Sequence, residues 1–188
     1  MPGQPTHALN EVPHLNVSLR LATMEDSAFI FETRKDPRRN EFLGGEPRSL
    51  FEQEAWMEGY LSRHAAGQEY YFVISDAKSG AACGLLRLYN VQAGQCVWGS
   101  WVLIESRPSG AAIESAYLSF RFIFNSLRLA SARLRVHKRN IRALRLYMLF
   151  GFSVSEDLPD EYEMVLDALT FFSQEAHWAK LLSGPGIN

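Results

Sequence analysis

The sequence predicts an α+β domain, in which helices surround a mixed, mostly antiparallel sheet. Three strand-like segments follow one another in the middle of the chain with only short turns between them, which is typical of an antiparallel meander. Segments with a helical period precede this meander, and helical segments alternate with single strands after it. This order favours the α+β class over a regularly alternating α/β fold.

The first part of the chain predicts one strand and two helices. Residues 17–22 alternate apolar and polar side chains, as a half-buried strand does. Thr23 can cap a helix, since an acidic residue follows three positions later, and this helix is expected to run to about Lys35. It should stop ahead of Pro37, because proline disfavours a helical predecessor. A second helix is expected over residues 49–64.

The rest of the chain predicts five strands and three helices. Gly80 and Gly94 suit the hairpin turns of the meander. The segment after Gly110 has a helical period, and the segment after Asn140 begins with a capping side chain and stops at Gly151. The expected elements are strands 70–75, 82–89 and 97–104, helix 110–127, strand 133–137, helix 140–150, strand 162–166 and helix 170–182.

Length and composition indicate one globular domain. The chain has 188 residues, 47% of them hydrophobic, enough to bury a core without a disulfide or a metal. Residues 1–16 are expected to form a flexible tail and residues 17–188 a single domain. No run approaches ~18 uncharged apolar residues, so no membrane span is expected. Cys83 and Cys96 are expected to be buried thiols, which indicates a reducing, cytoplasmic location.

Basic residues are concentrated between Arg107 and Tyr147. This stretch holds nine Lys or Arg residues and one acid, Glu114, although the whole chain has a formal net charge of −2. The asymmetry indicates that the stretch faces an anionic ligand, with a solvated basic face as the alternative. The acid-rich remainder makes the domain a poor platform for nucleic acid.

A loop of small residues leads from the last strand of the meander into the next helix. Residues 105–112 read Glu-Ser-Arg-Pro-Ser-Gly-Ala-Ala. Unpaired backbone N–H groups at a helix start, together with the helix dipole, form a physical site for phosphate. An ordinary helix cap is the alternative interpretation.

Two motifs resemble the GNAT family of acetyltransferases. Residues 107–112 are similar to the family pattern Gln/Arg-x-x-Gly-x-Gly/Ala, although Pro108 contributes no N–H group to the loop. Residues 140–152 contain Asn-x-x-Ala-x-x-Leu-Tyr and then Gly-Phe, which resembles the second half of the GNAT core. The motifs stand in the family order, and the elements expected from 17 to 166 fit the GNAT fold.

The resemblance implies acetyl-CoA as cosubstrate, held where the strand before the loop separates from the next, parallel strand. A bulge in the first strand would direct an N–H group at the thioester carbonyl. The backbone of 102–104 is expected beside the pantetheine arm, and the 109–112 amides at the pyrophosphate. The implied cofactor-binding residues are Val102, Leu103, Ile104, Arg107, Ser109, Gly110, Ala111, Ala112, Asn140 and Tyr147.

Two catalytic residues are expected. The motif implies that Tyr147 is the acid that protonates the departing thiolate. Glu105 is the first candidate for the base, because an alkyl amine with a pKa near ~10 is mostly protonated at neutral pH and must lose a proton before it attacks. His137 is the alternative base. Trp98 and Trp101 are expected either to line an acceptor pocket or to pack in the core.

Acceptor recognition is expected from residues 31–41. The Arg-x-Asp-Pro motif at 34–37 resembles two branches of the superfamily. One branch acetylates nucleotide-linked amino sugars and the other acetylates N-terminal amines of ribosomal proteins, and the later strands look closer to the sugar branch. We therefore expect a small-molecule amine or amino sugar as acceptor, with a non-catalytic acyl-CoA-binding domain as the alternative.

Metal chemistry and an acyl-enzyme are not expected. No His, Cys or Asp cluster has the spacing of a zinc site, and no serine elbow is present, so we expect direct transfer. The C-terminal helix 170–182 is expected to pack on its own domain, with a homodimer contact as the alternative.

Overall fold

The structure, a computed structural model, describes residues 12, 14–40, 42 and 48–182. Within them seven strands form one sheet in the order β1-β2-β3-β4-β5-β7-β6, parallel only between β4 and β5. This sheet and its helices confirm the α+β prediction. The elements are β1 (Val17–Leu21), a 3-10 turn (Met24–Asp26), α1 (Ser27–Arg34), α2 (Pro37–Asn40), α3 (Leu50–Ala65), β2 (Tyr70–Asp76), β3 (Ala82–Gln92), β4 (Gln95–Leu103), α4 (Ala111–Arg121), a π-helical turn (Phe122–Ser126), β5 (Ser131–His137), α5 (Ile141–Leu149), β6 (Ser153–Asp157), β7 (Glu161–Asp167) and α6 (Ala168–Leu182).

Two short elements were missed by the sequence prediction. β6 is an edge strand whose five residues are all exposed, so it carries no alternation of buried and exposed side chains. It is held by antiparallel pairing with β7. α2 begins at Pro37, the residue expected only to end a helix. Proline also fits the first position of a new helix, because the N–H group that it lacks is unpaired there.

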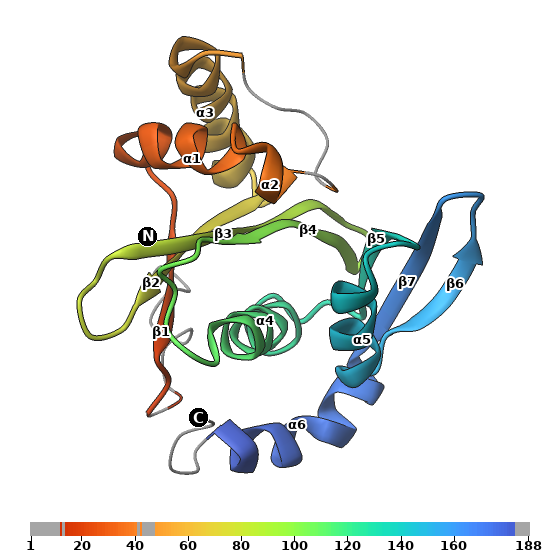
Figure 1. Ribbon diagram of the computed structural model, residues 1–188. Coiled ribbons are helices and arrows are strands. Elements are labelled where there is room, and N and C mark those ends of the chain that lie inside the picture. Colours follow the sequence, from red (N-terminus) through yellow and green to blue (C-terminus); the bar gives the residue numbers. More distant parts are fainter. Residues whose placement is uncertain (1–11, 13, 41, 43–47, 183–188) are drawn as a thin grey trace.

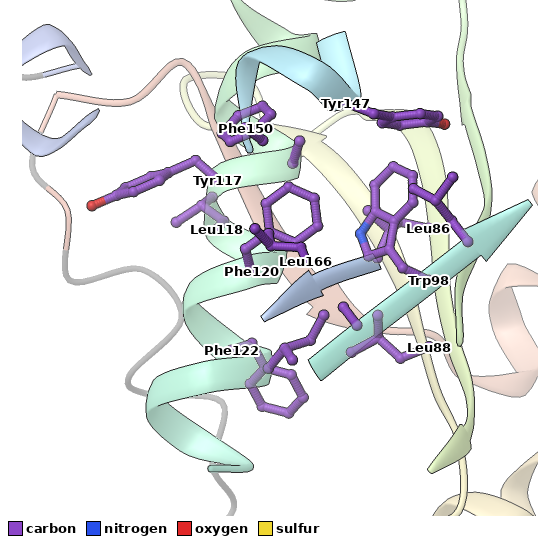
Figure 2. Packing of buried hydrophobic residues seen from close by; sticks show 14 of the residues in the cluster. Leu86, Leu88, Trp98, Tyr117, Leu118, Phe120, Phe122, Tyr147, Phe150 and Leu166 are labelled. Carbon is purple, nitrogen blue, oxygen red and sulfur yellow. The ribbon is translucent and has the colours of Figure 1, made fainter. Parts of the chain in front are cut away.

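Helices cover the sheet on both sides (Figure 1). α1, α2 and α3 lie on one face of β2, β3 and β4, whereas α4, α5 and α6 lie on the other. The larger buried cluster lies between the sheet and α4–α6, and Figure 2 shows Trp98, Phe120 and Phe150 within it. α6 packs on its own domain as expected, since Trp178 stacks on Phe150 with ring centroids 4.4 Å apart.

β4 and β5 separate along their length. They pair only at three positions, Gln95 with Ser131, Cys96 with Ala132 and Val97 with Arg133. β4 then continues to Leu103 and β5 to His137 without further pairing in the described part of the sheet. The expected gap between two parallel strands is therefore present, and it lies at the C-terminal ends of both.

A bulge interrupts β4 inside this unpaired stretch. Val102 pairs with Leu85 and Gly99 pairs with Arg87, so β4 has one residue more than β3 between these positions. Ser100 carries the irregularity with φ of 48°, a left-handed conformation that is uncommon for a side chain larger than glycine. The expected bulge is confirmed, and it bends the strand where β4 leaves β5.

Glu114, the one acid between Arg107 and Tyr147, holds the start of α4 against β1. The buried Glu114 carboxylate accepts hydrogen bonds from the Asn16 backbone N–H (2.7 Å), the Asn16 side chain (2.9 Å) and the Val17 N–H (3.1 Å). Of the predicted tail, residues 1–11 and 13 lie outside the described residues, and Asn16 is fixed by these contacts. Glu114 thus sets where the first turn of α4 sits.

The two cysteines are free and buried, as predicted. Burial raises the pKa of the Cys83 thiol to about 11 and that of Cys96 to about 12. Because the thiolate is the reactive form, neither group is suited to nucleophilic catalysis near neutral pH.

At pH 8 both thiols are expected to react with DTNB at least about 100-fold more slowly than free cysteine. A free thiol of pKa ~8.5 is about one quarter ionised at this pH, and a thiol of pKa about 11 about one part in a thousand. The measurement is the release of thionitrobenzoate from native protein. In guanidinium chloride the two cysteines should react at the ordinary rate, and fast reaction of the native protein would contradict the prediction.

Candidate active site

A cavity of about 550 Å³ opens where β4 and β5 separate. Its walls come from Trp98–Leu103 of β4 and from Leu134–His137 of β5. The loop before α4, Ala112 of α4, and α5 contribute to the lining from one side of the sheet, and Arg38 and Phe42 at and after α2 contribute from the other. A cavity bounded by two separated strand ends can hold an elongated molecule between them.

Tyr147 of α5 lies at this cavity. Its side chain is 8% exposed, with its ring edge-on to Trp98 at 5.5 Å between centroids and 5.8 Å from Phe152. Figure 2 shows the hydroxyl directed away from the Trp98 ring. Among the described residues the hydroxyl has no hydrogen-bond partner. Burial raises the Tyr147 pKa above its ordinary value, so the group stays protonated and can donate a proton or a hydrogen bond.

The start of α4 offers unpaired backbone donors. Gly110 is the N-cap with φ of 77°, and the first bond inside the helix runs from the Glu114 N–H to the Gly110 carbonyl (3.0 Å). Ala111 donates to the Pro108 carbonyl (3.3 Å), so the N–H groups of Ala112 and Ile113 have no partner within the helix. With the helix dipole they form an anion site, and Ala112 lines the cavity.

The backbone of β4 presents Leu103, not its neighbours, to the gap. The Ile104 N–H donates to the Cys83 carbonyl of β3 (3.0 Å), and the Ile104 carbonyl accepts from Arg107. Successive residues of a strand direct their backbone groups to opposite edges, so Val102 also faces β3. Of the three expected positions, Leu103 directs its N–H and carbonyl toward the separated edge.

Asn140 and Arg107 border the cavity on the side of α4 and α5. The Asn140 Oδ1 accepts the Ala143 N–H (3.2 Å) and caps α5, as the sequence predicted. Arg107 is exposed, and its Nη1 donates to the Ile104 carbonyl at 3.0 Å, which holds the loop before α4. Ser109 of this loop is exposed and does not line the cavity.

Glu105 and His137 both line the cavity. Glu105 is exposed and lies in a turn, two residues after the end of β4. Hydrogen bonds to Asp36 raise the pKa of Arg38, and the negative charge of Glu105 raises it further. The His137 ring lies 5.5 Å from the Phe42 ring, and its Nδ1 accepts the Arg139 backbone N–H at 3.1 Å.

Both tryptophans contact the α4 side of the sheet. The Trp98 Nε1 donates to the Ser119 hydroxyl (2.8 Å) and the Trp101 Nε1 to the Ser115 hydroxyl (3.2 Å). Trp98 is 1% exposed and belongs to the core, and Trp101 is half-buried. Both residues also line the cavity, and a role in an acceptor pocket stays a prediction.

Part of the charge of the basic stretch is taken up by ion pairs. Acids from later in the chain pair with Arg121 (Glu175, 3.4 Å), with Arg133 and Arg135 (Glu163, 2.8 and 3.4 Å) and with Lys138 (Asp157, 2.5 Å). These acids lie outside residues 107–147, so the sequence count overstated the charge left for a ligand. The basic residues of the stretch that line the cavity are Arg107, Arg135, His137 and Arg142.

Gly110→Ala is expected to weaken CoA binding about tenfold or more. A Cβ at this position would lie 2.8 Å from the Glu114 Oε1, so the carboxylate and the first turn of α4 must move. Gly80→Ala is the matched control, since Gly80 has φ of 73° and open space around its Cβ position. Both variants carry the left-handed strain of ~1–2 kcal/mol, but only Gly110→Ala should change the affinity. Calorimetry with CoA measures this, and equal affinities would contradict the prediction.

In the described part of the chain no helix is long and apolar enough to cross a membrane.

The comparisons with known proteins fit the geometry of the site. No curated protein matches this chain. FdhC, described as a nucleotide-linked sugar GNAT, has a TM-score of 0.82 at 25% identity, covering 89% of this chain and 95% of that chain. Spermidine N-acetyltransferase from Vibrio cholerae, in complex with CoA and spermine, has a TM-score of 0.75 at 20% identity, covering 84% and 98%.

A family model matches most of the chain. The model is described as an acetyltransferase (GNAT) domain, and it matches residues 16–153. The match includes the gap between β4 and β5, the start of α4, and Tyr147. The chain therefore belongs to the GNAT family and is an N-acetyltransferase.

Proposed function

We propose that this enzyme transfers the acetyl group of acetyl-CoA to the amino group of a nucleotide-linked amino sugar. The observation that carries the proposal is the cavity in the gap between β4 and β5. Its described lining residues include four arginines, Arg38, Arg107, Arg135 and Arg142, and one carboxylate, Glu105. Two of the arginines have an acidic partner outside the lining, since Arg38 pairs with Asp36 (2.7 Å) and Arg135 with Glu163 (3.4 Å). A cavity lined in this way favours two anionic substrates, one at each end.

The cofactor end is the side of α4 and α5. The unpaired N–H groups of Ala112 and Ile113, with Arg107 and Arg142 nearby, suit the pyrophosphate. The backbone groups of Leu103 face the gap and suit hydrogen bonds with the pantetheine arm, beside Asn140. The bulge at Ser100 supports an N–H group directed at the developing oxyanion.

The proposed reaction is direct transfer. Glu105 takes the proton of the acceptor ammonium, directly or through a water molecule. The freed amine attacks the thioester carbonyl carbon and a C–N bond forms; the nitrogen then releases its second proton to solvent and the C–S bond breaks. Tyr147 donates a proton to the departing sulfur and regains one from solvent. This chain's side chains therefore supply one proton acceptor and one proton donor on the two sides of the transferred group.

The charge of the cavity favours an anionic acceptor over a polycationic one. The neighbour described with spermine acts, by its name, on spermidine. A polycation would face the arginines at both ends of this cavity, and like charges close together are unfavourable. The 25% identity to FdhC, named a nucleotide-linked sugar GNAT, supports the anionic acceptor instead.

The test is thiol release from acetyl-CoA with a panel of acceptors. A UDP- or dTDP-linked amino sugar should give a kcat/KM at least about tenfold above spermidine and above a peptide with a free N-terminus. Preference for spermidine or the peptide would reject the proposed acceptor class. Calorimetric binding of acetyl-CoA with no turnover of any acceptor would instead support a non-catalytic acyl-CoA-binding domain.

A further inference from the structure

His137 and Arg135 share one face of β5 at the acceptor end of the cavity. The strand buries Leu134 and Val136 on its α4 side, so the alternate residues Arg135 and His137 lie on the opposite face. Both line the cavity. Alternate residues of a strand stand about 6.6 Å apart, close enough to contact neighbouring groups of one ligand.

A backbone contact fixes which nitrogen of His137 carries the proton. The Arg139 N–H lies 3.1 Å from the His137 Nδ1. A backbone N–H can only donate, so Nδ1 must present its lone pair, and the proton of the neutral ring is on Nε2. A ring in this tautomer has no second lone pair with which to accept the proton of an amine. His137 therefore offers the cavity an N–H donor.

Arg135 shares its acidic partner with a second arginine. Glu163 lies 2.8 Å from the Arg133 guanidinium and 3.4 Å from that of Arg135, so its one carboxylate is divided between two cations and Arg135 is at the longer distance. Arg135 is 61% exposed. The cross-strand partner of His137 on β7 is Glu161, which does not line the cavity. Arg38 and Glu105 face the same end from α2 and from the end of β4.

We propose that Arg135 and His137 form an anion-binding site for a phosphoryl group of the acceptor, and that His137 positions the acceptor through its Nε2–H. The second part reassigns His137 from candidate base to hydrogen-bond donor. The site rests on the proposed function for the identity of its ligand, since a nucleotide-linked sugar carries the phosphoryl groups. It lies on the face of β5 opposite the buried Leu134 and Val136, whereas the cosubstrate's own phosphates are proposed to bind at the start of α4.

The tautomer is tested first and without turnover. Nitrogen-15 NMR of the histidine side chains in wild-type protein, assigned with His137→Gln, distinguishes the protonated from the unprotonated ring nitrogen. We expect the proton on Nε2 in the neutral ring. A proton on Nδ1 would overturn the assignment of His137 as donor, whichever acceptor the enzyme uses.

The anion site is tested with UDP and protein saturated with CoA, so that the cofactor end is occupied. The wild-type protein should bind UDP, and the substitutions Arg135→Gln and His137→Phe should each lower the affinity for UDP about tenfold. Arg145→Gln is the control, because Arg145 is exposed on α5 and does not line the cavity. Absence of UDP binding, or equal affinity in all variants, would overturn the site. UDP binding that depends on both residues, without turnover of nucleotide-linked amino sugars, would keep the site and reject the proposed function.

Kinetics separate positioning from base catalysis. His137→Gln places an amide N–H near the Nε2 position, and His137→Phe removes the donor. We expect His137→Phe to raise the acceptor KM about tenfold with kcat within about threefold of wild type, and His137→Gln to recover most of the loss. A kcat loss of about 100-fold in both variants, with unchanged KM, would show that His137 is the base and would overturn the proposal.

Discussion

Replacing Glu105 by glutamine is expected to lower kcat about 100-fold at pH 7.5, with the KM for acetyl-CoA nearly unchanged. Loss of a general base usually costs 10²–10⁴-fold in rate, or ~3–5 kcal/mol of transition-state stabilisation. Glutamine keeps the size and polarity of the side chain but cannot accept the proton of an ammonium group. Steady-state thiol release with saturating acceptor measures the change.

The position of Glu105 favours it over the other candidates. It lies two residues after the end of β4 and lines the cavity. His137 holds its proton on Nε2, because its Nδ1 accepts the Arg139 N–H. Glu163 is engaged by two arginines and does not line the cavity. Among the described residues that line the cavity, Glu105 is thus the one with a carboxylate side chain.

Glu161→Gln is the matched control for this variant. Glu161 lies on β7 opposite His137 but does not line the cavity, so kcat should stay within about twofold of wild type. The defect of Glu105→Gln should also shrink for an acceptor amine whose pKa is below the assay pH, because that amine is already neutral. A loss of kcat that is equally large for acceptors of low and high pKa, or no loss at all, would show that Glu105 is not the base.

Features set by neighbouring residues could be predicted from the sequence. Asn140 caps α5, as its side chain suggested, and α3 begins one residue after the predicted start at Ser49, whose hydroxyl accepts the Glu52 N–H at 3.2 Å. Gly110 and Gly151 adopt φ of 77° and 90°, which glycine allows without strain. Such caps and turns depend on a few consecutive residues, so their physical cause is visible in the sequence.

Features set by distant pairing could not be derived in this way. β6 has a single apolar residue, Val154, and exists because β7 supplies its hydrogen bonds. The charge of the basic stretch was overstated, because Glu163 and Glu175 approach it only in the folded chain. The gap between β4 and β5 came from the family resemblance, since no local pattern tells where two parallel strands stop pairing.

Tyr147→Phe is expected to lower kcat tenfold or more near pH 7.5, with the acetyl-CoA KM within about twofold of wild type. Phenylalanine keeps the ring edge-on to Trp98 and against Phe152, so packing should survive. The variant loses only the hydroxyl, which lies at the cavity and stays protonated because burial raises the Tyr147 pKa. Loss of this donor leaves the departing thiolate without a proton, and tenfold corresponds to ~1.4 kcal/mol.

The dependence of this defect on the leaving thiol distinguishes a proton donor from a packing residue. A thiol of lower pKa leaves more readily as the thiolate, so its departure depends less on a proton donor. The ratio of wild-type to Tyr147→Phe kcat should therefore be smaller for the acetyl thioester of a more acidic thiol than for acetyl-CoA, whereas a packing defect would give the same ratio for both. Tyr117→Phe is the control, because Tyr117 is also buried and its pKa is also raised by burial, but it does not line the cavity. Its kcat should equal that of wild type with both thioesters, so an equal loss in both variants would assign the Tyr147 effect to the core and not to the leaving group.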